Sequence, residues 1–308
     1  MTAAVVLLGY SIVAAWCASA LLSPLTAGGA SVRPALAAWL SAMASVLMSA
    51  ALGASIIART GLADWPTFTR LLCQGVAGTA CTPQVYGSAL YSAGMAILAV
   101  VIPLAALAAL WCYGRRTRRA VTKTRCHARA ALLAGRELAG TGAVVLDDPR
   151  PVAYCVAGRP AAIVVSSGAL ALLDKEQLAA VLAHERAHLA GRHHLLATVT
   201  RSLAAMLPAV PLFTRGAEEV GRLAELAADD MAARSAGRHV LVAALLAIAT
   251  GNAVPVGALG AAGYAVPARV ERLLHPPRSG TAAMLGLALA LMSVVFFLFP
   301  AALAAVAG

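Results

Sequence analysis

The chain has 308 residues, of which 61% are hydrophobic and 12% are charged, and its formal net charge is +11. Soluble domains carry about 25% charged residues, so this composition excludes an ordinary soluble protein and indicates a membrane protein. The basic residues lie mostly beside apolar segments, where they act as topology signals and contact anionic lipid, so we do not expect direct nucleic-acid binding. The six cysteines include no Cys-x-x-Cys pair, which argues against a cysteine-based zinc or redox site.

Four apolar segments are long enough to cross a bilayer as helices. The first is predicted to be a membrane helix and not a cleaved signal peptide, because it lacks a basic start and a short apolar core. A polar loop at residues 59–85 contains Cys73 and Cys81, and its predicted compartment permits a disulfide between them without fixing the geometry. The four spans are predicted at about residues 1–22, 35–58, 86–111 and 281–306.

The run Gly114-Arg-Arg-Thr-Arg-Arg119 directly follows the third predicted span. By the positive-inside rule this end of the span is cytoplasmic, which places the amino terminus and the loop 59–85 outside. Residues 1–113 therefore form the first membrane region. Residues 114–280 are richer in charge and turn residues, and are enough for one compact cytoplasmic domain. Residues 281–308 form the fourth span, with no room after it for an extracellular domain.

The sequence His184-Glu-Arg-Ala-His188 predicts a zinc site. A capping-box pattern, Asp174-Lys-Glu-Gln177, starts the helix that would carry it. On that helix both histidines lie on one face, one turn apart, where they can bind one zinc ion. Glu185 is then placed to act as the general base on the attacking water.

Two short runs upstream, Pro151–Val156 and Ala161–Ser166, are predicted to form paired strands. The second strand is expected to offer an edge to an extended peptide substrate. Downstream, the apolar stretch 195–213 is interrupted by Arg201 and Pro208. A single membrane crossing there would place everything after it on the side opposite to the two histidines. We therefore expect an interfacial or buried helix.

A catalytic zinc normally takes three protein ligands, and two residues compete for the third place. Glu225 lies in Glu225-Leu-Ala-Ala-Asp229, on a predicted helix from 218 to 234 that Gly237 would end. His194 is the alternative, because His184-Glu-x-x-His188-x-x-Gly191-x-x-His194 matches the metzincin pattern. Spacing alone leaves both open. His127, His193, His239 and His275 are expected to be surface or packing residues.

The order of spans, basic juncture, His-Glu-x-x-His, Glu-x-x-Ala-Asp and last span resembles the BlaR/MecR-type membrane metallopeptidases. Val165–Leu170 and Arg269–Leu274 extend the likeness over most of the chain. The resemblance implies a gluzincin in which His184, His188 and Glu225 bind zinc, Glu185 is the base and Asp229 supports a ligand histidine. The heat-shock and prenyl-protein membrane endopeptidases share these motifs, although their spans are arranged differently.

We therefore expect a multi-pass α-helical membrane protein with four transmembrane helices. Between the third and fourth lies a cytoplasmic α+β zincin-like (gluzincin) metallopeptidase domain that binds one Zn²⁺ per chain. Unlike the β-lactam sensors, the chain lacks a penicillin-binding domain after its last span, so direct β-lactam sensing is not expected. Tyr264, Arg269 and Arg272 are undecided candidates for stabilising the oxyanion.

The expected function is regulatory cleavage of a cytoplasmic or membrane protein, with a transcriptional repressor as one candidate substrate. Heat-shock-type quality control of membrane proteins is the alternative within the enzyme class. A catalytically idle receptor or scaffold is the alternative outside it, and the intact Glu185 argues against that. The partners are a protein or peptide substrate and the lipid bilayer, and the oligomeric state is left open.

Overall fold

A computed structural model describes residues 2–29, 31–76, 83–251 and 261–307, without the side chains of 64–76, 83–90, 261–265 and 307. Within these residues four helices are long and apolar enough to cross a membrane, as the sequence predicts. The sequence leaves the pairing of Cys73 and Cys81 open, and the side chains of both lie outside what is described. The four helices are α1 (Thr2–Thr26), α2 (Val32–Val76), α3 (Pro83–Ala134) and α10 (Ser279–Ala307).

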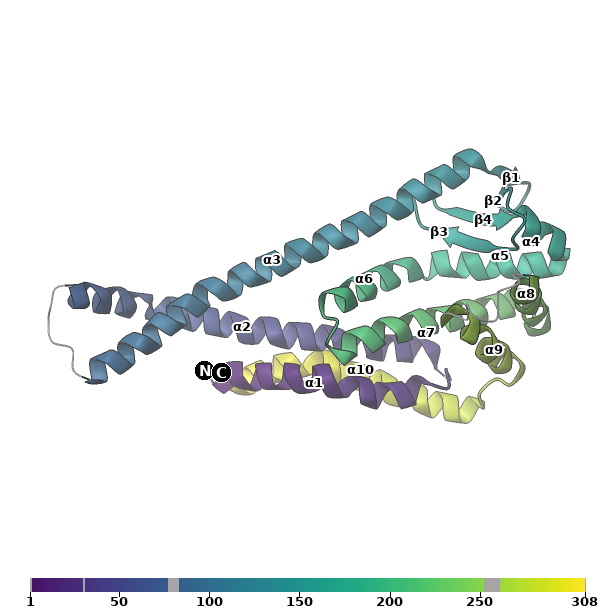
Figure 1. The fold of residues 1–308 in the computed structure, drawn as a ribbon. Helices are drawn as coiled ribbons and strands as arrows, with labels where there is room; N and C mark the ends of the chain where they lie inside the picture. The colour runs from purple at the N-terminus through teal and green to yellow at the C-terminus, as the bar shows by residue number, and fades with distance from the viewer. Residues whose placement is uncertain (1, 30, 77–82, 252–260, 308) are drawn as a thin grey trace.

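Helix α3 does not end with its apolar part but continues to Ala134. The segment from Arg115 to Ala134 contains no glycine or proline and is rich in alanine and arginine, which favour the helix. Figure 1 shows α3 diverging from the other long helices and leading to a small sheet. The basic run of residues 115–119 therefore lies on a continuous helix between the third span and the sheet.

The sheet has four strands in the order β1-β2-β4-β3. The predicted pairing of the third and fourth strands is confirmed, and it is antiparallel. The prediction that residues 161–166 offer an edge is wrong, because β4 also pairs with β2 in parallel and is buried throughout. A continuous apolar run is typical of such an interior strand. The strands are β1 (Arg136–Leu138), β2 (Ala143–Leu146), β3 (Ala153–Val156) and β4 (Ala162–Ser166).

The remaining helices cover the sheet and connect it to the spans. The predicted capping box is confirmed, since Asp174 and Gln177 each accept a hydrogen bond from the other's backbone N–H. Gly237 ends its helix, as predicted, with a φ of 89° that favours glycine. The helices are α4 (Ser167–Leu172), α5 (Lys175–Ala190), α6 (His193–Met206), α7 (Pro211–Ala236), α8 (Arg238–Gly251) and α9 (Ala261–Leu274).

The apolar stretch 195–213 turns back on itself, because α6 and α7 form a helical hairpin (Figure 1). Leu212 and Phe213 are fully buried in a hydrophobic cluster with α1, α2 and α10. Gly216 permits the close approach, since a Cβ there would overlap Met43 and lie 3.1 Å from the Trp39 ring. Helix α7 therefore shares a core with the membrane helices.

Candidate metal centre

Two imidazoles of α5 point to one place in the structure. His184 and His188 are one turn apart, and their Nε2 atoms are 3.0 Å from each other. Both side chains are largely buried, with 10% of His184 and 14% of His188 exposed. The predicted helix therefore presents two nitrogen donors on a rigid, buried support.

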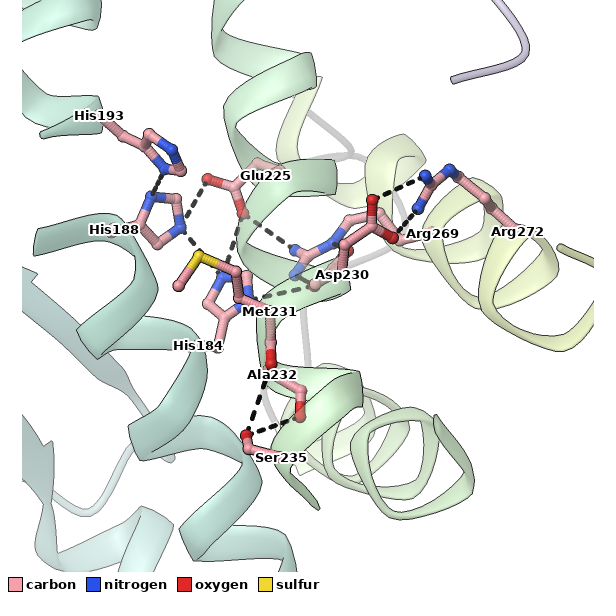
Figure 2. Close-up of polar contacts among 11 residues, drawn as sticks. His184, His188, His193, Glu225, Asp230, Met231, Ala232, Ser235, Arg269 and Arg272 are labelled. Atoms are coloured by element: carbon pink, nitrogen blue, oxygen red, sulfur yellow. Dashed lines mark hydrogen bonds and ion pairs between the residues drawn. The ribbon is translucent and has the colours of Figure 1, made fainter. Parts of the chain in front are cut away.

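Glu225 reaches the same place from α7, as Figure 2 shows. Its Oε2 lies 3.5 Å from Nε2 of His184, and its Oε1 lies 3.4 Å from Nε2 of His188. Ligands at about 2.0–2.2 Å from a tetrahedral zinc ion are about 3.3 Å apart. The donor set and its spacing therefore fit zinc. Within the described residues, His184, His188 and Glu225 form a cluster whose side chains are arranged to hold a metal.

Asp229, one turn after Glu225 on α7, is fully buried behind His184. Its Oδ1 lies 3.1 Å from Nδ1 of His184, close enough for an ion pair although the atoms are not aligned as a hydrogen bond. Arg269 of α9 donates two hydrogen bonds to Asp229, at 2.6 and 2.7 Å. Its remaining nitrogen lies 3.2 Å from Oε2 of Glu225. One guanidinium thus holds both carboxylates of α7 in place.

These contacts shift the acidities of the cluster in opposite directions. Burial alone would lower the pKa of His184, but the carboxylates of Asp229 and Glu225 outweigh it and raise that pKa to about 9. The pKa of Glu225 is lowered, because both imidazoles and Arg269 outweigh its burial. Burial raises the pKa of Glu185. Without a metal, His184 therefore holds a proton, and the carboxylates of Glu225 and Asp229 are ionised.

The three residues considered for the oxyanion are placed differently. Arg269 lines the cavity, but its nitrogens are engaged by Asp229 and Glu225. Arg272 points away from the cluster, where it binds Asp230 and donates to the Gly29 carbonyl (Figure 2). Tyr264 belongs to α9, and its side chain lies outside the described residues. Arg272 therefore joins α9 to the α1–α2 turn and does not face the reacting groups.

His193 is a site residue that the sequence analysis took for a surface or packing residue. It is buried, and its Nδ1 lies 3.0 Å from Nδ1 of His188. Gly191 makes room for it, since a Cβ there would overlap the imidazole of His193 and lie 2.7 Å from its Cδ2. In the metzincin-like pattern, Gly191 thus makes room for the ring of His193. His194 faces a separate cavity and is not among the clustered side chains.

The cluster opens into a cavity of about 1150 Å³. His184, Glu185, His188 and Glu225 line one part of it. Apolar side chains of α5, α8 and α9 line much of the rest: Val181, Leu241, Leu245, Leu246, Val266 and Val270. Glu185 therefore faces the same space as the three donors, and that space has an apolar wall suited to substrate side chains.

Comparisons with known proteins agree with this geometry. The sequence model of peptidase family M48 matches residues 118–279, just over half of the chain. A Protease HtpX homolog from Acidiphilium cryptum (strain JF-5) is 33% identical over 155 residues. The match covers 49% of this chain and 48% of that relative, so the chain spans about half of the relative's length. No solved structure matches the chain. The narrower resemblance to BlaR/MecR-type transducers stays a prediction.

Proposed function

Because the chain belongs to peptidase family M48, a family of membrane zinc metallopeptidases, we propose that it is a zinc endopeptidase that cleaves protein substrates beside the membrane. The convergence of His184, His188 and Glu225 with Glu185 on one cavity carries the proposal. A zinc ion held by the three ligands would polarise the scissile carbonyl and lower the pKa of the attacking water.

Glu185 supplies the proton transfers of this reaction. Its carboxylate takes a proton from the attacking water and delivers it to the leaving amine. Burial raises the pKa of Glu185, which makes it a better base than an exposed glutamate. Exchange for glutamine keeps the shape of the side chain and removes this capacity. We expect E185Q to lose cleavage at least 100-fold while it retains zinc.

Three further residues position the ligands. Asp229 fixes the ring of His184, and His193 fixes the ring of His188 through their Nδ1 atoms. Arg269 balances the charge of Asp229 and holds Glu225. Such supporting contacts orient ligand rings and increase their basicity. The proposal for the ligand set is tested by measuring zinc in E225A and H194A side by side, and loss confined to H194A would overturn it.

The outer edge of β3 is the surface that we propose for the substrate backbone. β3 is the last strand of the sheet, and it lies against α5. Ala153 of β3 lines the same cavity as the metal ligands. An extended peptide that pairs with this edge would bring its carbonyl groups past the cluster. Exchange of a β3 residue for proline would remove a backbone donor and should raise KM.

The site is proposed to face the cytoplasm, with the amino terminus outside. The basic run of residues 115–119 follows the apolar part of α3 on the way to the sheet. The turn between α1 and α2 accepts hydrogen bonds from Arg222 of α7 and Arg272 of α9, so the amino terminus of α1 lies at the opposite end of the bundle (Figure 1). Three spans put the amino terminus and the domain on opposite sides of the membrane, and the basic run supports the domain side as the cytoplasmic one.

Two physiological roles fit this peptidase. The named relative, a Protease HtpX homolog, supports broad quality control of membrane proteins. The order of spans and motifs supports regulated cleavage of one substrate, such as a repressor. Quantitative proteomics of cells carrying the wild type or E185Q separates them. A single accumulating protein supports regulation, and accumulation of many membrane proteins supports quality control. If the proteome of cells carrying E185Q equals that of cells carrying the wild type, an idle scaffold is favoured.

A further inference from the structure

A second cavity, of about 420 Å³, lies apart from the metal centre. Its walls come from the cytoplasmic part of α3, the β3–β4 turn and the junction of α5 with α6. Three arginines and a histidine line it, namely Arg125, Arg159, Arg192 and His194. Consecutive histidines thus serve different places, because His193 contacts the ligand His188 and His194 faces this cavity.

The cavity is strongly cationic. No acidic residue is among the described residues that line it. Within the described part of the chain, Arg125, Arg159 and Arg192 take part in none of the ion pairs, which involve other arginines. The three arginines are exposed, and a bound anion would supply the counter-charge that these ion pairs do not. Planar guanidinium groups are well matched to phosphate oxygens.

The backbone of Arg192 gives an independent indication that its side chain has a use. Arg192 has φ 49° and ψ 35°, a left-handed conformation, and no other non-glycine residue in the described chain has a positive φ. A side chain in this conformation costs about 1 kcal/mol or more relative to glycine. The side chain of Arg192 makes no hydrogen bond that caps α6. A glycine would suit this turn better, so the arginine here comes at a cost to local stability.

The cavity lies where α6 meets the membrane helices. Leu196, one turn into α6, already packs against the hydrophobic cluster formed by α1, α2, α7 and α10. Leu195, which lines the cavity, is 41% exposed, and so is Val199 one turn later. An arginine-lined cavity beside exposed apolar side chains matches the headgroup and the first acyl carbons of a phospholipid.

We propose that this cavity binds a phosphate group, supplied by the headgroup of an anionic phospholipid. Arg159 and Arg192 hold the phosphate oxygens, Arg125 adds charge from α3, and the exposed leucine and valine of α6 contact the acyl chains. The proposal is independent of zinc and of proteolysis, because none of these residues belongs to the metal cluster.

The test is native mass spectrometry of the full chain in detergent, titrated with dioleoyl phosphatidylglycerol or dioleoyl phosphatidylcholine. The wild type should bind phosphatidylglycerol at least tenfold more tightly than phosphatidylcholine. R192G and R159A should each lower the affinity for phosphatidylglycerol about tenfold. R234A removes an equal charge from an exposed position near the end of α7, outside the cavity, and it should change the affinity less than twofold.

The variant R192G also separates loss of lipid binding from loss of folding. Glycine relieves the left-handed backbone, so the melting temperature of R192G should equal or exceed that of the wild type while lipid binding falls. Equal losses in R192G and R234A would mean diffuse attraction and would overturn the proposal, as would equal affinity for the two lipids. A second titration uses inorganic phosphate as a competitor of the bound lipid. Displacement of the lipid only at millimolar phosphate supports a lipid source, and equal affinity for both would overturn that source.

Discussion

Replacing Gly191 with alanine should weaken zinc binding, although Gly191 is not a ligand. The backbone there has φ −76°, which any residue adopts, so the effect must be steric. The new Cβ would lie 2.7 Å from Cδ2 of His193, whereas carbon atoms in contact are about 3.5–4.0 Å apart. The imidazole must therefore move by roughly 1 Å. A shift of that size disrupts the 3.0 Å contact with His188, because hydrogen-bond distances vary only over about 2.7–3.2 Å.

Loss of a contact that orients a ligand histidine typically costs about 10–100-fold in metal affinity, or about 1.4–2.7 kcal/mol. The variant H193A should lose the same amount, because it removes the same contact. In the H193A background the alanine at position 191 meets no ring, so it should cost almost nothing more. The two substitutions are therefore expected to be strongly non-additive.

The assay is zinc competition with a chromophoric chelator, on the full chain in detergent, for the four members of this cycle. Melting temperatures recorded in parallel separate loss of zinc from loss of fold. H194A serves as the control, because the neighbouring histidine faces away from the cluster, and it should change zinc affinity less than twofold. Additive effects of G191A and H193A, or an unchanged affinity in G191A, would refute the reasoning.

Three other perturbations test the surroundings of the cluster. R269M should lower the free energy of unfolding by about 3–5 kcal/mol, because it leaves Asp229 buried without its partner, and D229N should recover part of the loss in denaturant titrations. G216V should lower the melting temperature by overlapping Met43, and M43A should suppress that defect if the close approach of α7 to α2 is real. Zinc binding near pH 7 should release about one proton, because the metal-free His184 has a pKa of about 9 and must lose its proton to become a ligand. Calorimetry in two buffers of different ionisation enthalpy measures this proton, and zero release would contradict the shifted pKa.

Much of the centre follows from local sequence. The spacing of His184 and His188 needs only a helix, and the capping box that starts α5 is local as well. The apolar spans are recognisable because the thickness of the hydrocarbon core sets their length and its apolarity sets their composition. The choice between Glu225 and His194 was not local, since both extend the same motif. It depends on where α7 returns, which tertiary packing decides.

The features that sequence reasoning missed are those set by distant contacts. The sequence predicts a surface or packing residue at His193, but its role beside a ligand appears only when the turn at residues 191–192 directs it towards His188. The sequence predicts β4 as an edge strand because its partner β2 is separated from it by β3 in the chain, and the short β1 and β2 give little periodicity. Parallel pairing of this kind leaves no turn signature in the sequence.

The packing of helix α7 ties the metal centre to the membrane helices. Its first half is buried against the membrane helices, and the same rigid rod carries Glu225 and Asp229. A fragment cut off from its membrane helices would expose Leu212 and Phe213 and leave the third ligand without support. The membrane helices therefore do more than anchor the peptidase, because the helix that carries Glu225 and Asp229 is packed against them.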